Sequence, residues 1–304
     1  MAVVNAVDND VNSVDDDGRT TTIDAMSPVD VDGARFAWRE NGTGDETVLL
    51  LHGLGGSRLS WEPQLDEIGE RCRVVAWDLP GYGASPARGP LTFALLADAV
   101  VELIDELGVS AVHLVGISFG GMIAQYTAAR HPLRVVTLTL LATSPMFGLD
   151  GTSPDHWRAA RLAPLDAGFE PADFADGVLA ALAGPSITPS AMAGQRVAMG
   201  RITGAALRRT IDCLLTHDSR SVLPSIVAPT RCLVGELDDE TPADYARAVA
   251  DLIPGASMQV VPDAGHLLNV EAPGAVNAAI LDQMRCRPGA TASSQASPER
   301  EDHV

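Results

Sequence analysis

The chain has 304 residues, of which 46% are hydrophobic and 20% are charged, so it can bury a full core in one large domain or slightly more. Its 40 acidic residues outnumber its 21 basic residues, all of which are arginines, and the formal net charge is −19. A surface of this charge repels nucleic acid and anionic membranes, which argues against both as partners.

The two ends of the chain differ in composition from the middle. Residues 1–26 contain six aspartates and one arginine, and residues 287–304 are rich in alanine, serine and charged residues. Neither segment has enough apolar residues to form a core. We therefore predict a disordered acidic extension over residues 1–26 and a disordered tail over residues 287–304.

Targeting signals and cysteine spacing bear on the cellular compartment. The first residues carry neither the cationic nor the apolar region of a secretory signal, and no apolar stretch reaches the roughly 18 residues that a transmembrane helix needs. The four cysteines are scattered without a C-x-x-C pair: Cys72, Cys213, Cys232 and Cys286. This spacing predicts free thiols rather than disulfides or a metal site. We expect a cytoplasmic protein with no metal and no cofactor.

Between the two ends, short apolar runs alternate with helical patterns, which is typical of a mostly parallel α/β sheet. The apolar runs predict strands over Thr47–Leu51, Arg73–Trp77, Ala111–Val115, Val136–Leu141, Thr230–Val234 and Ser257–Val261. Several of these runs are apolar throughout rather than alternating, as expected for strands that are covered on both faces.

Two connecting segments have the pattern of helices that pack on a sheet. In Leu91–Leu107 the apolar residues recur at helical spacing, and Gly108 follows as a C-terminal cap. Phe119–Arg130 carries several small residues, which allow a helix to lie close to a sheet, and Pro132 ends it.

The strand pattern stops between Met146 and Val222. Prolines divide this stretch into short helical pieces such as His156–Leu162 and Ala205–Leu215. An insertion of about 75 residues is too long for an ordinary loop. We predict a helical cap over residues 146–222, inserted into a core formed by residues 27–145 and 223–286.

Residues 116–121 read Gly-Ile-Ser-Phe-Gly-Gly, which is G-x-S-x-G between a predicted strand and a predicted helix. In this context a sharp, strained turn exposes the serine hydroxyl, so Ser118 is a candidate nucleophile. Gly116 and Gly120 leave room where side chains would clash. Because a serine hydroxyl is a poor nucleophile at neutral pH, it also needs a base and a site for the developing oxyanion.

The segment His52-Gly-Leu-Gly-Gly56 follows the first predicted strand and is the candidate oxyanion loop. An oxyanion hole needs two donors aimed at the developing charge. The backbone N–H groups of Leu54 and Phe119 are the expected pair. We expect His52 to shape this loop; the alternative for the whole segment is a tight turn without a catalytic role.

Two later loops carry the remaining candidates. Gly235–Pro242 follows a predicted strand, at the sheet edge where open α/β folds place their sites. We predict that Asp238 orients the catalytic histidine, with Asp239 as the alternative. His266 follows the last predicted strand, and we predict it as the general base because the order Ser…Asp…His is the one expected for G-x-S-x-G.

Together these motifs resemble the α/β-hydrolase superfamily over roughly residues 30–285. Val75–Ser85 (VAWDLPGYGAS) is similar to the D-x-P-G-x-G-x-S stretch of that family, Trp61 fits an aromatic position after the oxyanion loop, and Glu271-x-Pro273 fits the run after the histidine. The serine nucleophile differs from the aspartate of haloalkane dehalogenases and epoxide hydrolases. The segment GISFGGMIAQYTAARHPLRV and the short cap look most similar to 3-oxoadipate enol-lactonase-like hydrolases.

The motifs and the resemblance together predict a hydrolase of carboxylic esters or lactones. His266 would take the proton from Ser118, an acyl-enzyme would form, and water would release the acid. Two alternatives on the same triad are a carbon–carbon bond hydrolase of the dienoate type and a cofactor-free haloperoxidase-like enzyme. Dienoate-type relatives often carry Asn where this chain has Ile117. An alternative of another class is a non-catalytic ligand-binding protein on the same scaffold.

The expected partner is a small-molecule substrate, whose identity the sequence leaves open together with the oligomeric state. Met146 and Phe147 stand where such lactonases can carry a basic residue, which argues against a small anionic substrate. The predicted cap nevertheless holds seven arginines against eight acids. Four of its arginines could meet a carboxylate or form ordinary surface ion pairs: Arg158, Arg161, Arg196 and Arg201.

Overall fold

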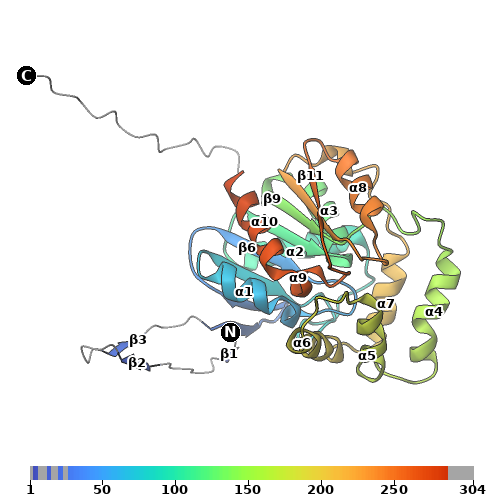
Figure 1. Ribbon diagram of the computed structural model, residues 1–304, viewed down its shortest axis with the longest axis horizontal. Coiled ribbons are helices and arrows are strands. Elements are labelled where there is room, and N and C mark those ends of the chain that lie inside the picture. The colour runs from blue at the N-terminus through green and yellow to red at the C-terminus, as the bar shows by residue number, and fades with distance from the viewer. Residues whose placement is uncertain (1–2, 6–11, 15–19, 23–26, 287–304) are drawn as a thin grey trace, which may run out of the picture.

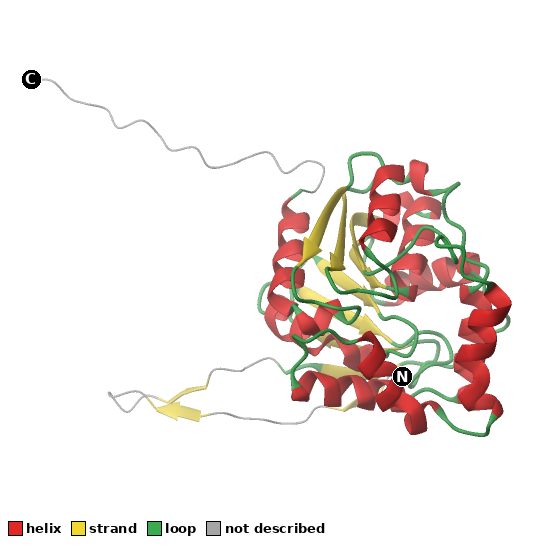
Figure 2. Ribbon diagram, turned by 45° about the vertical axis from the view of Figure 1, so that its right-hand side comes forward, coloured by secondary structure: helices red, strands yellow, loops and turns green. Residues whose placement is uncertain are grey.

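The computed structural model describes residues 3–5, 12–14, 20–22 and 27–286. Helices cover both faces of a twisted central sheet, and four further helices, α4 to α7, gather at one side of the molecule (Figures 1 and 2). Within the predicted acidic extension the described residues form three short strands: β1 (Val3–Asn5), β2 (Asn12–Val14) and β3 (Thr20–Thr22). The rest of residues 1–26 and the predicted tail, residues 287–304, lie outside the described residues.

The central sheet has nine strands in the order β1-β4-β5-β7-β6-β8-β9-β10-β11. Along this order, β1–β4, β4–β5 and β5–β7 are antiparallel pairs. The following pairs, β7–β6, β6–β8, β8–β9, β9–β10 and β10–β11, are parallel. The strands after β3 are β4 (Val29–Asp32), β5 (Ala37–Asn41), β6 (Thr47–Leu51), β7 (Arg73–Trp77), β8 (Val112–Ile117), β9 (Val135–Leu141), β10 (Thr230–Gly235) and β11 (Ser257–Val261). The predicted α/β-hydrolase fold class is confirmed.

The six predicted strands correspond to β6 to β11, with ends that move by no more than two residues. Strands β4 (VDVD) and β5 (AWREN) were not predicted from the sequence, because they contain no continuous apolar run. Both strands lie on the antiparallel side of the sheet, and β5 is held by its pairing with β7. These strands form because they pair with neighbouring strands, and the sequence of a short, half-polar segment does not predict such pairing.

Strand β6 shows how the sheet is buried on both faces. All five of its residues are buried. Leu49 and Leu51 belong to one apolar cluster together with residues of α2 (Phe93–Glu106) and α3 (Phe119–Arg130). Val48 and Leu50 point the other way, into a cluster with α1 (Glu62–Gly69) and α10 (Pro273–Arg285). Since successive side chains of a strand alternate between faces, a continuous apolar run is what a doubly covered strand requires.

The helices on the core begin and end at the expected signals. The Thr92 side chain caps α2 by accepting from the Leu95 N–H at 3.2 Å, and Gly108 follows the helix with a φ of 73°. Helix α3 has the predicted bounds. The remaining helices of the core are η1 (Arg58–Trp61), η2 (Pro132–Arg134), η3 (Leu223–Ser225), α8 (Ala243–Leu252) and α9 (Leu268–Glu271).

Residues 146–222, here called the helical insertion, lie between β9 and β10. The insertion contains α4 (Pro154–Asp166), α5 (Pro171–Leu182), α6 (Pro189–Gly200) and α7 (Gly204–Leu214). Proline is the first residue of α4, α5 and α6, where its missing N–H costs no hydrogen bond. Leu207 and Ile211 of α7 join the apolar cluster of the core, so the insertion packs directly on it.

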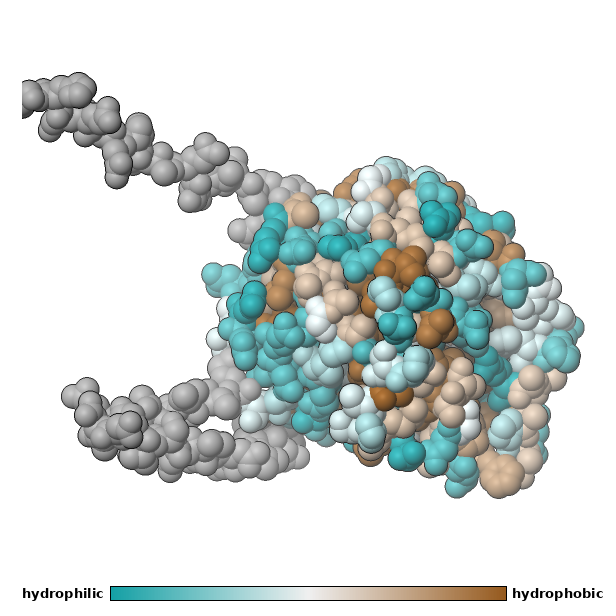
Figure 3. Space-filling view, in the orientation of Figure 1, coloured by the Kyte–Doolittle hydropathy of each residue, from teal (hydrophilic) through white to brown (hydrophobic). Residues whose placement is uncertain are grey.

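The surface seen in Figure 3 carries many hydrophilic side chains with smaller groups of hydrophobic ones between them. None of the helices within the described ranges combines the length and the apolar character needed to cross a bilayer.

Gly120→Ala should strongly destabilise the fold. A Cβ at this position would lie 2.1 Å from the Leu51 carbonyl oxygen and 2.6 Å from that of His52, so β6 and α3 would have to separate. We expect the free energy of unfolding, measured in urea, to fall by about 3 kcal/mol or more.

Gly177→Ala is the matched control, because Gly177 is exposed on α5 and a Cβ there meets no atom within 4 Å. It should leave stability unchanged or raise it by about 0.5–1 kcal/mol, since alanine favours a helix. Equal effects of the two substitutions would show that the contact between β6 and α3 is not constrained.

Candidate active site

Ser118 occupies the turn that joins β8 to α3. Its φ of 53° and ψ of −119° are rare for a residue other than glycine and indicate local strain. The Ser118 N–H donates to the Leu141 carbonyl at 2.8 Å, and the Thr143 hydroxyl donates to the Ser118 carbonyl at 2.9 Å. A Cβ at Gly116 would lie 2.4 Å from the Gly120 carbonyl oxygen. The turn is therefore held by hydrogen bonds to the end of β9 and the segment after it, and by close packing of Gly116 against Gly120, as the G-x-S-x-G motif requires.

His266 and Asp238 form a buried pair on neighbouring loops after β11 and β10. The Nδ1 atom of His266 lies 2.9 Å from Oδ2 and 3.1 Å from Oδ1 of Asp238. The carboxylate also accepts from the N–H groups of Glu240 and Thr241, at 3.0 and 2.8 Å, and from the Thr241 hydroxyl at 2.9 Å. Asp239, the sequence alternative, is exposed. Geometry thus selects Asp238 as the partner of His266.

Burial and charge act in opposite directions on the pKa of this pair. Burial of the His266 ring lowers its pKa, but the attraction and hydrogen bond of Asp238, together with the charges of Glu240 and Glu271, outweigh it and raise the pKa above 6.5. Burial raises the pKa of Asp238, and the interactions with His266 and Thr241 outweigh it, so that this pKa is lowered. With Nδ1–H donated to the carboxylate, Nε2 is the nitrogen left to accept a proton.

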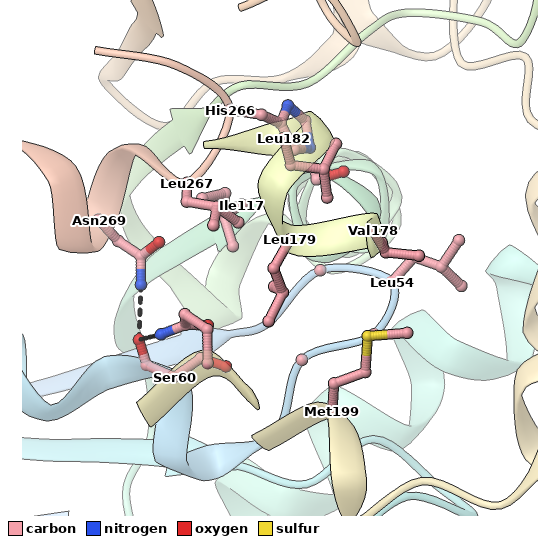
Figure 4. A pocket seen from close by; sticks show the side chains of 15 residues that line it. Leu54, Ser60, Ile117, Val178, Leu179, Leu182, Met199, His266, Leu267 and Asn269 are labelled. Carbon is pink, nitrogen blue, oxygen red and sulfur yellow. Dashed lines mark hydrogen bonds between the residues drawn. The ribbon is translucent and has the colours of Figure 1, made fainter. Parts of the chain in front are cut away.

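Ser118 and His266 line the same pocket, which also holds Leu54 of the loop after β6. Figure 4 shows His266 beside Leu182 at the wall of this pocket. In the described part of the chain, no hydrogen bond joins the Ser118 hydroxyl to His266. Such contacts often tighten only when a substrate binds, so an open geometry is compatible with catalysis.

The loop of residues 52–56 lies against the nucleophile. A Cβ at Gly53 would be 3.2 Å from the Ser118 Cβ. Phe119 is the first residue of α3, where an N–H has no partner within its own helix. Among the described residues neither the Leu54 nor the Phe119 N–H donates a hydrogen bond, so both donors are available for an oxyanion.

His52 has the structural role that the sequence analysis expected. Its Nε2 accepts from the Leu79 N–H at 3.0 Å, its Nδ1 lies 2.9 Å from the Gly53 carbonyl, and its ring stacks on Tyr82 with centroids 5.4 Å apart. Burial lowers its pKa, which favours the neutral ring. The D-x-P-G-x-G-x-S segment closes the neighbouring turn, where Asp78 accepts from the Arg58 and Ala84 N–H groups at 2.9 and 3.1 Å.

Glu271 is a structural residue of the site to which the sequence analysis assigned no role. Its buried carboxylate accepts from three backbone N–H groups: those of Gly184 and Gly265 at 2.8 Å and that of Leu267 at 2.9 Å. Gly184 follows α5 of the insertion, whereas Gly265 and Leu267 flank His266. The His266 N–H in turn donates to the Leu182 carbonyl at 2.9 Å. One carboxylate therefore ties the histidine loop to the insertion; the only signal in the sequence is its place in Glu-x-Pro.

Two lobes open next to Ser118, which lines both of them. The apolar lobe also contacts His266 and encloses about 500 Å³ of empty space including its mouth. Most of the side chains that line it are apolar: Leu54, Ile117, Val178, Leu179, Leu182, Met199 and Leu267, beside the polar Ser60, Gln195 and Asn269 (Figure 4). The acidic lobe encloses about 720 Å³ in the same measure, and its lining includes Met122, Phe147, Asp150, Trp157, Arg161, Asp239, Glu240 and Tyr245. A third cavity joins them and is lined by Ser118, His266, Trp157, Arg161 and Glu240 among others.

The four arginines that could meet a substrate carboxylate all have a carboxylate partner already. The pairs are Arg158–Asp212, Arg161–Glu240, Arg196–Asp176 and Arg201–Asp78. Of these four, Arg161 alone lines the lobes beside Ser118. Within the ranges that the structure describes, no group of three or more His, Cys, Asp or Glu side chains is placed to hold a metal ion.

Known proteins resemble the chain in sequence and in fold. Residues 48–279 match the Alpha/beta hydrolase family. Over 225 residues the chain is 34% identical to a pimeloyl-[acyl-carrier protein] methyl ester esterase of Chromobacterium violaceum, covering 72% of this chain and 86% of that protein. A thermophilic esterase from Thermogutta terrifontis matches with a TM-score of 0.73 and 28% identity, over 86% of this chain and 98% of its own.

The enol-lactonase of Burkholderia xenovorans LB400 matches with a TM-score of 0.68 and 24% identity, over 86% of this chain and 98% of its own. At this identity the likeness concerns the fold alone, so the finer resemblance to enol-lactonases stays a prediction.

Asp238→Asn should lower the pKa of His266. Burial of the ring remains in this variant, whereas the charge and the hydrogen bond of Asp238, which contribute most to raising the pKa, are lost. The pKa is measured by NMR titration of the imidazole protons. Asp239→Asn is the matched control and should shift this pKa much less, because Asp239 is exposed. Equal shifts in both variants would contradict the assignment of Asp238 as the partner.

Glu271→Gln should loosen the histidine loop and the insertion together. Glutamine keeps one acceptor oxygen, so its NH₂ must face either the Leu267 N–H or those of Gly184 and Gly265, and at least one of the three loses its acceptor. We expect the free energy of unfolding to fall by about 2 kcal/mol and amide hydrogen exchange to quicken at one or more of these three residues. The control is Glu236→Gln, an exposed residue that accepts only from the Asp263 N–H, at 3.3 Å, among the described residues. A loss no larger than in this control would contradict the role of Glu271.

Proposed function

The chain belongs to the alpha/beta hydrolase family, and we propose that it is a serine hydrolase that cleaves a carboxylic ester or lactone bond of a small molecule through an acyl-enzyme. The observation that carries the proposal is the buried His266–Asp238 pair, whose histidine lines the same pocket as Ser118 in its strained turn. The two esterases described above support ester chemistry, and a lactone is a cyclic ester that the same steps would open.

In the proposed first half of the reaction, Nε2 of His266 takes the proton of the Ser118 hydroxyl while its oxygen attacks the carbonyl carbon. Asp238 holds the ring with Nδ1–H toward itself and stabilises the imidazolium that forms. The N–H groups of Leu54 and Phe119 donate hydrogen bonds to the oxyanion of the tetrahedral intermediate. When the intermediate collapses, the C–O bond breaks and His266 returns the proton to the leaving oxygen.

The second half repeats these roles with water. His266 takes a proton from a water molecule, whose oxygen attacks the acyl carbon of the Ser118 ester. The same two N–H groups hold the second oxyanion. Collapse releases the carboxylic acid and returns the proton to the serine oxygen, so no external oxidant or cofactor is required by this sequence of steps.

Ser118→Ala should abolish turnover while leaving the fold intact, because the side chain that it shortens is only partly buried. Against a panel of aryl esters, enol-lactones and vinylogous diketones, we expect the natural chain to hydrolyse esters or lactones and the variant to lose on the order of 10³-fold or more in kcat/KM. A fluorophosphonate probe should label the natural chain and not the variant.

Ser186→Ala, an exposed serine of the insertion, is the control and should keep both activity and labelling. Turnover of the diketones alone would favour carbon–carbon bond cleavage. Failure of Ser118 to react with the probe in folded protein would favour a ligand-binding protein.

A further inference from the structure

The acidic lobe contains more negative than positive charge. Its lining includes the carboxylates of Asp150, Asp239 and Glu240 but one guanidinium, that of Arg161. Arg161 directs one nitrogen at both oxygens of Glu240, at 2.8 and 2.6 Å, and its guanidinium lies 5.0 Å from the centre of the Trp157 ring. The arginine is thereby held in place and its charge compensated. Two carboxylates of this lobe have no cation there to balance them.

The other two carboxylates face the lobe from different elements. Asp150 precedes α4, and hydrogen bonds from Thr152 lower its pKa, so it is ionised at neutral pH. Asp239 belongs to the loop after β10 and is exposed. An anionic group that enters the lobe would therefore approach like charges without finding a free arginine.

The position of His266 indicates which part of a substrate occupies which lobe. In the proposed reaction His266 gives its proton to the leaving oxygen, so the leaving group must lie on the side of His266. The apolar lobe is lined by both His266 and Ser118, whereas the acidic lobe is lined by Ser118 without His266; the cavity that joins them is lined by His266 together with Arg161 and Glu240. With the leaving group in the apolar lobe, the acyl chain extends past the Arg161–Glu240 pair toward the acidic lobe.

We propose that the acidic lobe selects acyl groups that end in a neutral or cationic group and rejects those that end in a carboxylate, with Glu240 as the specificity-determining residue. This inference rests on the proposed ester hydrolysis and concerns the substrate of that same site. Glu240 acts by occupying Arg161, the residue that would otherwise bind a substrate carboxylate. A neutral hydroxyl or a quaternary ammonium meets no such repulsion and can contact the remaining carboxylates and Trp157.

The test compares three 4-nitrophenyl esters with the same chain length: the hexanoate, the 6-(trimethylammonio)hexanoate and the monoester of adipic acid. The aryl leaving group suits the apolar lobe, and the acyl terminus alone changes. For the natural chain we expect kcat/KM for the adipate ester to be about tenfold or more below that for the hexanoate. The ammonium ester should equal or exceed the hexanoate, and raising the salt concentration should reduce the difference between the charged esters.

Glu240→Gln removes one charge and frees Arg161, so it should raise the adipate/hexanoate ratio of kcat/KM about tenfold. The ratio is the readout because the Glu240 N–H also binds Asp238, and a change in that contact affects all three esters alike. Asp239→Asn is the matched control: it removes one charge from the same lobe and leaves the Arg161–Glu240 pair intact. A similar gain in both variants, or three esters hydrolysed within about twofold by the natural chain, would overturn the proposal.

Binding to Ser118→Ala separates this inference from the proposed function. The three esters are titrated calorimetrically into that variant with and without Glu240→Gln, and their dissociation constants should follow the same order as kcat/KM. If the natural chain turns over none of the three esters but the variant binds them in this order, the hydrolase proposal is overturned and the charge selection is supported. Turnover without the order of binding would overturn the charge selection alone.

Discussion

The site depends on the close approach of α3 to the end of β6 at Gly120, where a single added carbon would lie 2.1 Å from the Leu51 carbonyl oxygen. This contact brings the first turn of α3 and the loop of residues 52–56 together next to Ser118. The strained φ of Ser118 persists because β6 and β8 are fully buried strands paired in parallel. A rigid sheet with both faces covered can hold such a turn, whereas a surface loop would relax it.

The histidine side of the site is held by a second constraint, the buried carboxylate of Glu271. Three N–H groups from two segments converge on it, and one of these segments belongs to the insertion. The His266 N–H binds the Leu182 carbonyl of the same insertion. The proposed base is therefore coupled through hydrogen bonds to α5, the helix that supplies Val178, Leu179 and Leu182 to the apolar lobe. A movement of the insertion would therefore also shift His266.

The sequence predicted those features of the fold and the site that depend on a local pattern of residues. The apolar runs predicted the parallel strands because double burial leaves no polar alternation, and G-x-S-x-G predicted the turn because few residues tolerate it. The sequence favoured Asp238 and kept Asp239 as the alternative, because the two are adjacent on one loop and only the structure shows that the first is buried and the second exposed. The sequence did not show that Arg161 pairs with Glu240, a contact across 79 positions. Partners so distant in sequence are set by the packing of the insertion on the core.

The same loop after β10 carries both the proposed orienting carboxylate and the residue that sets the charge of the acidic lobe. Glu240 donates its N–H to Asp238 and accepts a hydrogen bond from the guanidinium of Arg161, so it links the proposed triad to the insertion. A substitution at Glu240 therefore acts on the charge of the lobe and on the setting of Asp238 together. A substitution at Arg161 acts from α4, which carries none of the proposed catalytic groups. Since α4 makes none of the hydrogen bonds that hold His266, substrate preference can vary on this helix at a lower cost to the proposed triad than in the loop of Asp238.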